Sequence, residues 1–251
     1  MTAIGVFVAT RWELAAVRQA FGTTEVQVVG GISCLVARQS QVEWWIIPMG
    51  VGPDRAAATA RAVLAVQPFT AVWSTGFACA LRPAGIGEVL IGTQVMMEGG
   101  REAGRSVPCT TTMVDWVRHV VQQQRLPMQS GRFVTVSRVL CRAEEKQDIA
   151  DRVGGVGLDM ESAALGLAAV ERQIPFVIVR TASDLVDESL PLDFNLFLRS
   201  SGWVKGVAAC LTHPRSVIGL NRLRVQSRVA GAQLTALYRA CAQKARRDGF
   251  A

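Results

Sequence analysis

Short apolar runs of strand length alternate along the chain with stretches in which apolar residues recur at helical spacing. The strands predicted in the first half lie at residues 4–9, 26–29, 32–37, 44–47, 71–74 and, after a turn, 85–95. Leu14, Val17 and Phe21 have helical spacing after the first strand. Pro53 opens an alanine-rich helix, because proline suits the first helical turn.

The second half continues the alternation. Helices are predicted at residues 112–124 and 143–152, with a strand at 132–136 between them. Residues 156–187 predict a strand, a helix over 160–172, a strand over 175–180 and a loop, and helices complete the chain. This order predicts an α/β fold with three α/β/α layers and a twisted, mixed, mostly parallel central sheet flanked by helices.

Composition adds limits on organisation. The 251 residues are half apolar, with no flexible linker and no repeat at a fixed period, so a single domain over residues 1–251 is expected, with a basic C-terminal helical extension at about 203–251. No apolar run approaches the ~20 residues that span a bilayer. No signal peptide is evident, so a cytoplasmic location is expected.

The net charge of +7 is unevenly placed: the residues from Lys205 onward include nine lysines and arginines against one acid, Asp248. This pattern fits a solvated helical face or contact with an acidic surface, either anionic lipid or nucleic acid. Only Tyr238 offers an aromatic ring for base stacking among these charges. Peripheral membrane contact therefore ranks above nucleic acid, which is not expected as a partner.

The metal-binding residue types are sparse. Six cysteines occur singly with no C-x-x-C pair, and the histidines are His119 and His213 alone. Zinc and a disulfide framework are not expected, and buried free thiols are the interpretation that fits cysteine best. We expect no metal and no cofactor.

Three carboxylates and a glycine follow predicted strands. Ligands of an open parallel sheet bind outside the carboxyl ends of its strands, and Glu13, Gly76, Glu161 and Asp184 all fall on that edge. Each acid also has a structural alternative. Glu13 and Glu161 lie where a helix dipole favours an acid, and Asp184 could form an Asx turn or a helix cap.

Two segments, LDMESAA at residues 158–164 and VIVRTASD at residues 177–184, resemble motifs of the nucleoside phosphorylase and nucleosidase superfamily (purine nucleoside phosphorylase family 1). The first resembles its Met-Glu ribose-binding motif, and the second resembles its Val-Arg-x-x-Ser-Asp motif. Supporting matches lie at residues 50–52, 74–76 and 9–13. The last is more similar to methylthioadenosine/S-adenosylhomocysteine nucleosidases and futalosine hydrolases than to phosphorylases.

The resemblance implies an N-glycosidase and a role for each residue. Glu161 would accept hydrogen bonds from the ribose hydroxyls, Met160 would pack against the sugar, and Asp184 would protonate the departing base at N7. Glu13 would activate water, as in glycoside hydrolysis. The other substrate-binding residues implied are Gly76, Phe77 and Ser183.

The sequence also departs from the family. Residues 77–80, FACA, replace a small polar residue and further glycine, which favours water over phosphate, although Arg11 and Arg55 keep phosphorolysis open. Residues 135–139 replace a Ser-Gly-Asp-x-Phe region, so base recognition is expected to differ. Asp187 is the alternative acid to Asp184.

The predicted function is hydrolysis of an adenine-type nucleoside. The substrate is methylthioadenosine-like or a lipid-linked adenosyl group, because phosphorylase-like proteins linked to hopanoid synthesis also belong to the superfamily and a basic tail suits a membrane-bound substrate. The alternatives are a phosphate-dependent phosphorylase and a non-catalytic nucleoside-binding protein of the same fold. A homodimer is expected, with Trp44, Trp45 and Trp116 as interface anchors.

Overall fold

The structure, a computed structural model, describes residues 1–99, 102–191, 195 and 214–248. The predicted C-terminal extension begins at 203, so residues 203–213, including Lys205, Cys210 and His213, lie outside the described residues. The limits of the single domain and of its extension stay a prediction.

The strands alternate with helices in the predicted order, apart from one short additional strand at residues 106–108. The strands are β1 (Thr2–Val8), β2 (Glu25–Val29), β3 (Ile32–Gln39), β4 (Val42–Pro48), β5 (Ala71–Ala80), β6 (Val89–Glu98), β7 (Ser106–Pro108), β8 (Met128–Val136), β9 (Gly157–Asp159) and β10 (Phe176–Leu185). The helices are α1 (Arg11–Arg18), α2 (Pro53–Leu64), α3 (Thr111–Gln123), α4 (Ala143–Val153), α5 (Ser162–Glu171) and α8 (Pro214–Asp248). Pro53 is indeed the first residue of α2, as the sequence predicts.

All ten strands belong to one mixed sheet, in the order β10-β6-β8-β9-β5-β1-β4-β3-β2, with β7 beside β6. Strand β10 pairs with β6 and also with β5. The strands β5, β10, β6, β8 and β9 therefore close into a ring, and β1, β4, β3 and β2 extend from β5 as an open sheet. The mixed sheet agrees with the predicted fold class, whereas the ring closure has no counterpart in the sequence pattern.

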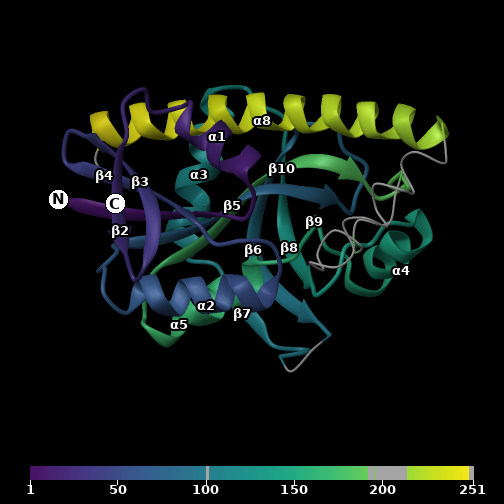
Figure 1. The fold of residues 1–251 in the computed structure, drawn as a ribbon, viewed down its shortest axis with the longest axis horizontal. Helices are drawn as coiled ribbons and strands as arrows, with labels where there is room; N and C mark the ends of the chain where they lie inside the picture. The colour runs from purple at the N-terminus through teal and green to yellow at the C-terminus, as the bar shows by residue number, and fades with distance from the viewer. Residues whose placement is uncertain (100–101, 192–194, 196–213, 249–251) are drawn as a thin grey trace.

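Helices cover both faces of the sheet, which completes the predicted three layers (Figure 1). Helix α8 runs across one side and packs against α1, α3 and β10. Helices α2 and α5 pack together on the other side, and α4 lies at the end of the molecule near β8 and β9.

The two strands that carry site residues at their ends, β5 and β10, continue at least five residues past their predicted ends. The run at 71–74 continues to Ala80, and the strand predicted to end at 180 continues to Leu185. The reason is pairing: β5 and β10 run parallel from Phe176↔Val72 to Leu185↔Ala80, with one register shift between Ala182 and Asp184, so each supplies the other with hydrogen bonds beyond the predicted strand ends. Ser183 and Asp184 thus lie on a strand, not in the loop predicted there.

Aromatic side chains fill the core between α8 and the sheet. Tyr238 of α8 is fully buried, and its ring contacts Trp44 and Trp73. Trp44 and Trp45 are 0% and 6% exposed, so the expectation that they anchor a subunit interface is wrong, because the chain's own core already covers them. Trp116 is half-buried against Trp73.

The described cysteines are free thiols, as predicted. Cys34, Cys79, Cys109 and Cys241 are buried and Cys141 is half-buried. No helix within the described ranges combines the length and hydropathy that a membrane span requires.

Candidate active site

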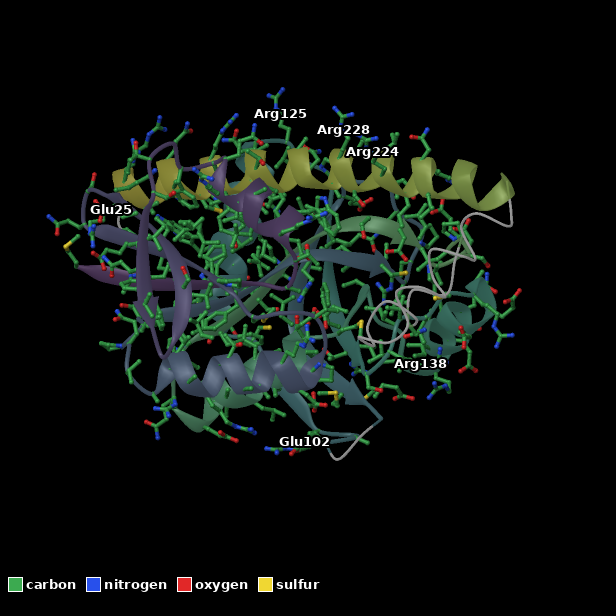
Figure 2. The ribbon with its side chains drawn as sticks, in the orientation of Figure 1. Glu25, Glu102, Arg125, Arg138, Arg224 and Arg228 are labelled. Carbon is green, nitrogen blue, oxygen red and sulfur yellow. The ribbon has the colours of Figure 1, made fainter. Side chains whose placement is uncertain are left out.

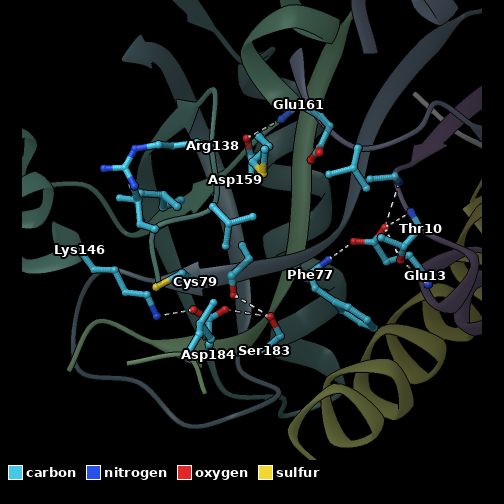
Figure 3. Close-up of a pocket in the computed structure, with 18 residues that line it drawn as sticks. Thr10, Glu13, Phe77, Cys79, Arg138, Lys146, Asp159, Glu161, Ser183 and Asp184 are labelled. Atoms are coloured by element: carbon cyan, nitrogen blue, oxygen red, sulfur yellow. Dashed lines mark hydrogen bonds and ion pairs between the residues drawn. The ribbon is translucent and has the colours of Figure 1, made fainter. Parts of the chain in front are cut away.

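One pocket collects the candidate residues at the carboxyl ends of β1, β5, β9 and β10 (Figure 3). It is lined by six of the seven residues predicted for the site: Glu13, Phe77, Met160, Glu161, Ser183 and Asp184. The seventh, Gly76, lies directly behind Glu13. The structure therefore brings together side chains that are up to 171 positions apart in the sequence.

Glu13 is held by four donors at the start of α1. Its Oε2 accepts hydrogen bonds from the backbone N of Ala9 (2.9 Å) and of Thr10 (2.6 Å) and from the Thr10 hydroxyl (3.0 Å). Its Oε1 accepts from the backbone N of Phe77 at 2.7 Å. Glu13 is thus both the capping-box acid of α1 and a wall of the pocket, with one lone pair of Oε1 unused by these donors.

Gly76 allows this approach of Glu13 to β5. A Cβ at position 76 would lie 2.1 Å from Glu13 Oε1, and the φ of Gly76 is +142°, where side chains other than glycine are strained. The conformation also turns the Phe77 N–H toward the carboxylate. Glu13 can therefore occupy this position only because residue 76 is glycine.

Glu161 lies between β9 and α5 and is not used as a helix cap. Its side chain makes no capping hydrogen bond, although the residue occupies the N-cap position of α5. Instead, Oε1 accepts from the backbone N of Gly52 at 2.9 Å, and Oε2 pairs with Arg180 Nη2 at 3.3 Å. Burial raises the pKa of Glu161 to about 7, against the opposing effect of the Arg180 cation.

Arg180 and Asp159 form a buried ion pair at the pocket, and Asp159 is one of the residues that line it. Arg180 Nε lies 2.9 Å from Asp159 Oδ2, and both side chains are 1% exposed. Arg180 also donates to the carbonyl of Phe77 at 2.9 Å and to the hydroxyl of Ser74 at 3.1 Å. Neighbouring carboxylates hold the pKa of Arg180 above its ordinary value despite burial, so the guanidinium stays charged and ties β5, β9 and β10 together at the site.

Asp159 organises the start of α5. Its Oδ1 accepts from the Thr135 hydroxyl (2.7 Å) and from the backbone N of Glu161 (3.2 Å) and of Ser162 (3.1 Å), and its Oδ2 accepts from the Ser162 hydroxyl. These bonds fix the chain on both sides of Met160. The rigid turn aims Met160 and Glu161 into the pocket.

Asp184 lies on β10 next to a β-bulge. The register with β5 shifts between Ala182 and Asp184, which leaves Ser183 without a paired residue and re-aims the side chains that follow. Asp184 Oδ1 accepts a hydrogen bond from the Ser183 hydroxyl at 3.1 Å, and Oδ2 lies 2.7 Å from Lys146 Nζ. Asp184 is 15% exposed and lines the pocket, whereas the alternative acid, Asp187, is exposed and lies outside its lining.

Three residues of the site were missed by sequence reasoning. Asp159 and Arg180 lie within the motifs at residues 158–164 and 177–184, next to residues that already had an expected role. A charged residue in a strand of apolar residues is a signal for such a role. Lys146 carries no comparable signal, because a lysine in a polar helix is ordinarily solvated. Here it is 1% exposed, since the closed ring of strands brings α4 over the end of β10.

The residues that kept phosphorolysis open lie elsewhere. Arg11 and Arg55 are exposed and neither lines the pocket. Arg11 instead stacks on the ring of Trp12 at 4.6 Å. Within the described part of the chain, no group of three or more histidine, cysteine, aspartate or glutamate side chains has the arrangement of a metal site.

Nucleosidases are among the known proteins that this chain resembles in sequence and in fold. The chain is 26% identical over 170 residues to a 5'-methylthioadenosine/S-adenosylhomocysteine nucleosidase of Staphylococcus aureus, covering 62% of this chain and 75% of that protein. A putative nucleosidase of the same name from Francisella philomiragia has a TM-score of 0.75 at 16% identity, over 94% of this chain and 96% of that chain. A futalosine hydrolase mutant of Helicobacter pylori has a TM-score of 0.70 at 17% identity, over 90% of this chain and all of that one.

The similar solved structures agree with the fold, and the family itself is shown by the match to a family model. The model of the phosphorylase superfamily matches residues 3–203, which include every candidate site residue named above. The chain is therefore an enzyme of the phosphorylase superfamily.

Proposed function

We propose that this protein hydrolyses the N-glycosidic bond of an adenine-type nucleoside and releases the free base. The observation that carries the proposal is the meeting of three carboxylates, Glu13, Glu161 and Asp184, in one pocket. Breaking this bond requires a group to hold the sugar, an acid to assist the departing base and a base to activate the nucleophile.

Glu161 is suited to hold the ribose. Its two oxygens accept one hydrogen bond from Gly52 and one from Arg180, which leaves lone pairs for the hydroxyl groups of a sugar. The backbone turn fixed by Asp159 orients Glu161 before substrate arrives, and Met160 offers a flexible apolar surface to the sugar ring.

Asp184 and Glu13 are suited to the two proton transfers. The O–H bond of protonated Asp184 breaks as N7–H forms, and the electron pair of the C1′–N9 bond passes into the base, which leaves neutral. The sugar acquires oxocarbenium character, water adds to C1′, and the proton of that water passes to Glu13. Before the next cycle, Glu13 releases its proton to solvent and Asp184 takes one up.

Water is favoured over phosphate by the state of the cations at the pocket. Lys146 is paired with Asp184, Arg138 donates to Glu145 at 2.6 Å, and Arg180 is paired with Asp159. An incoming phosphate would compete with carboxylates for each of them. The phosphate-dependent phosphorylase stays the alternative reaction, and a non-catalytic nucleoside-binding protein is the alternative outside enzymology.

The deciding experiment incubates the purified chain with a panel of adenosine derivatives and follows free adenine by chromatography, with and without phosphate. We expect base release at the same rate in both buffers, with methylthioadenosine-like and lipid-linked adenosyl compounds as the preferred substrates. Release that stops when phosphate is omitted supports the phosphorylase. Tight binding without release from any compound supports the binding protein.

We also propose peripheral contact with an anionic membrane through the outer face of α8. Its exposed side chains include Arg224 and Arg228, which project outward along the upper edge of the view in Figure 2, together with Val225 and Val229 at 52% and 43% exposure. Residues 214–247 contain no acid, and a helix of this length presents a basic face ~50 Å long. Arginine beside exposed apolar side chains suits the headgroup region of a bilayer. A homodimer remains part of the proposal, to be checked by sedimentation.

A further inference from the structure

A buried lysine makes the strongest contact to the proposed general acid. Lys146 of α4 is 1% exposed, and its ammonium reaches three acceptors: Asp184 Oδ2 at 2.7 Å, the carbonyl of Glu188 at 2.9 Å and the carbonyl of Leu185 at 3.2 Å. An ammonium has three N–H donors, so these bonds use all of them and fix its position.

The other titratable groups around this pair do not compete for it. Cys79 of β5 stands opposite Asp184 in the strand register, and burial followed by the nearby Asp184 charge raises the pKa of its thiol well above the ordinary value, which keeps it neutral. The Glu188 carboxylate is engaged by Arg222 and Gln226 of α8. The charge that faces Asp184 at contact distance is therefore that of Lys146.

We infer that Lys146 is a positioning residue for Asp184 in the proposed reaction. By taking Oδ2, the ammonium leaves Oδ1, the oxygen bonded to Ser183, as the one that addresses the base (Figure 3). When Asp184 gives its proton to N7 it becomes a carboxylate beside a fixed cation, so the charge that develops in the transition state meets a preorganised partner. Lys146 itself neither gains nor loses a proton.

This inference rests on the proposed function and sharpens the expectation that base recognition differs from the family's pattern. In this chain the segment at 135–139 precedes α4, and Lys146 of α4 contacts Asp184. The acid is thus oriented from a second element, α4, in addition to the bulge of β10.

The test is chemical rescue. Lys146→Ala removes the cation and leaves space for a small amine, so we expect kcat for base release to fall about 10²-fold with a smaller change in KM. Ethylammonium added to the buffer should restore kcat in a saturable manner, whereas propanol, of similar size and uncharged, should not. If the alanine variant does not fold, kcat is measured on Lys146→Met, which keeps most of the side-chain volume without the charge.

Ile149→Ala is the matched control, since it opens a buried apolar space one turn further along α4 without touching Asp184. We expect it to lower the melting temperature and to keep kcat within about twofold, with no response to ethylammonium. A Lys146 variant that keeps the kcat of the unmodified enzyme, or a loss that propanol restores equally, overturns the inference. Absence of base release by the unmodified enzyme contradicts the proposed function instead.

Discussion

Single residues of the site serve the fold and the proposed chemistry at once. Glu13 caps α1 and lines the pocket, so the helix-dipole interpretation and the catalytic interpretation of its position are compatible. Glu161 differs, because it makes no cap and its carboxylate is directed to Gly52 and Arg180. A buried carboxylate that does no capping is the more informative of the two for function.

The raised pKa of Glu161 predicts an acid limb in the pH profile. In the proposed function its ionised form accepts hydrogen bonds from both ribose hydroxyls, and burial raises its pKa to about 7 from an ordinary value of 4.5. As pH falls through 7 the carboxylate gains a proton and loses acceptor capacity, so kcat/KM of the unmodified enzyme should decline below that pH.

Glu161→Gln is uncharged at every pH, so we expect its kcat/KM to be lower by about 10- to 100-fold and to lack this limb. Steady-state rates of base release between pH 5 and 9 make the comparison. A limb with an unchanged midpoint in Glu161→Gln would show that another group controls it.

At the scale of elements, the sequence predicts the order of strands and helices and misses where two strands end. Apolar runs mark the first part of β5 and β10, but their last residues, from Phe77 to Ala80 and from Thr181 to Leu185, are held in the strands by pairing with each other. Pairing partners distant in sequence leave no trace in local periodicity. The candidate acids could be named because motifs and strand ends agreed, whereas Lys146 depends on the ring closure that local patterns do not encode.

The packing of β5 against α1 predicts the effect of Gly76→Ala. The new Cβ would occupy the position of Glu13 Oε1, at a φ that favours glycine, so the carboxylate must move. We expect the free energy of unfolding to fall by about 1–3 kcal/mol and kcat to fall with it. Gly85→Ala is the control, because a Cβ there meets no atom within 4 Å, and it should leave both quantities near those of the unmodified enzyme. Denaturant unfolding and base release provide the two measurements, and equal behaviour of the two variants would contradict this account of Gly76.

At the scale of the whole molecule, the basic C-terminal helix is part of the core as well as of the surface. Tyr238 is buried and hydrogen-bonded to the Thr75 hydroxyl, and Leu234 and Leu237 are fully buried, so the inner face of α8 covers the sheet. Arg224 and Arg228 of its outer face are exposed. The excess of basic residues near the end of the sequence thus lies on one surface of the molecule, the outer face of α8.

That surface predicts salt-sensitive binding to anionic vesicles. Replacing Arg224 and Arg228 by glutamate should abolish cosedimentation with phosphatidylcholine vesicles that contain phosphatidylglycerol, since electrostatic attraction is worth about 1 kcal/mol per basic residue near the surface. Replacing Arg61 and Arg172, which belong to the α2 and α5 side of the sheet, makes the same charge change and should preserve binding. Equal loss of vesicle binding in both double variants contradicts binding through the outer face of α8. Tighter binding of the unmodified protein to duplex DNA than to vesicles points to nucleic acid as the partner instead.

The whole account depends on one pocket acting as a catalyst through Asp184. The most direct measurement compares base release and nucleoside binding by Asp184→Asn and by Asp187→Asn, whose residue is exposed outside the pocket. We predict that Asp184→Asn binds nucleoside with little change in affinity while its kcat falls by about 10²- to 10⁴-fold, and that Asp187→Asn matches the unmodified enzyme. Equal rates of base release by Asp184→Asn and the unmodified enzyme, or loss of activity in Asp187→Asn alone, would contradict it.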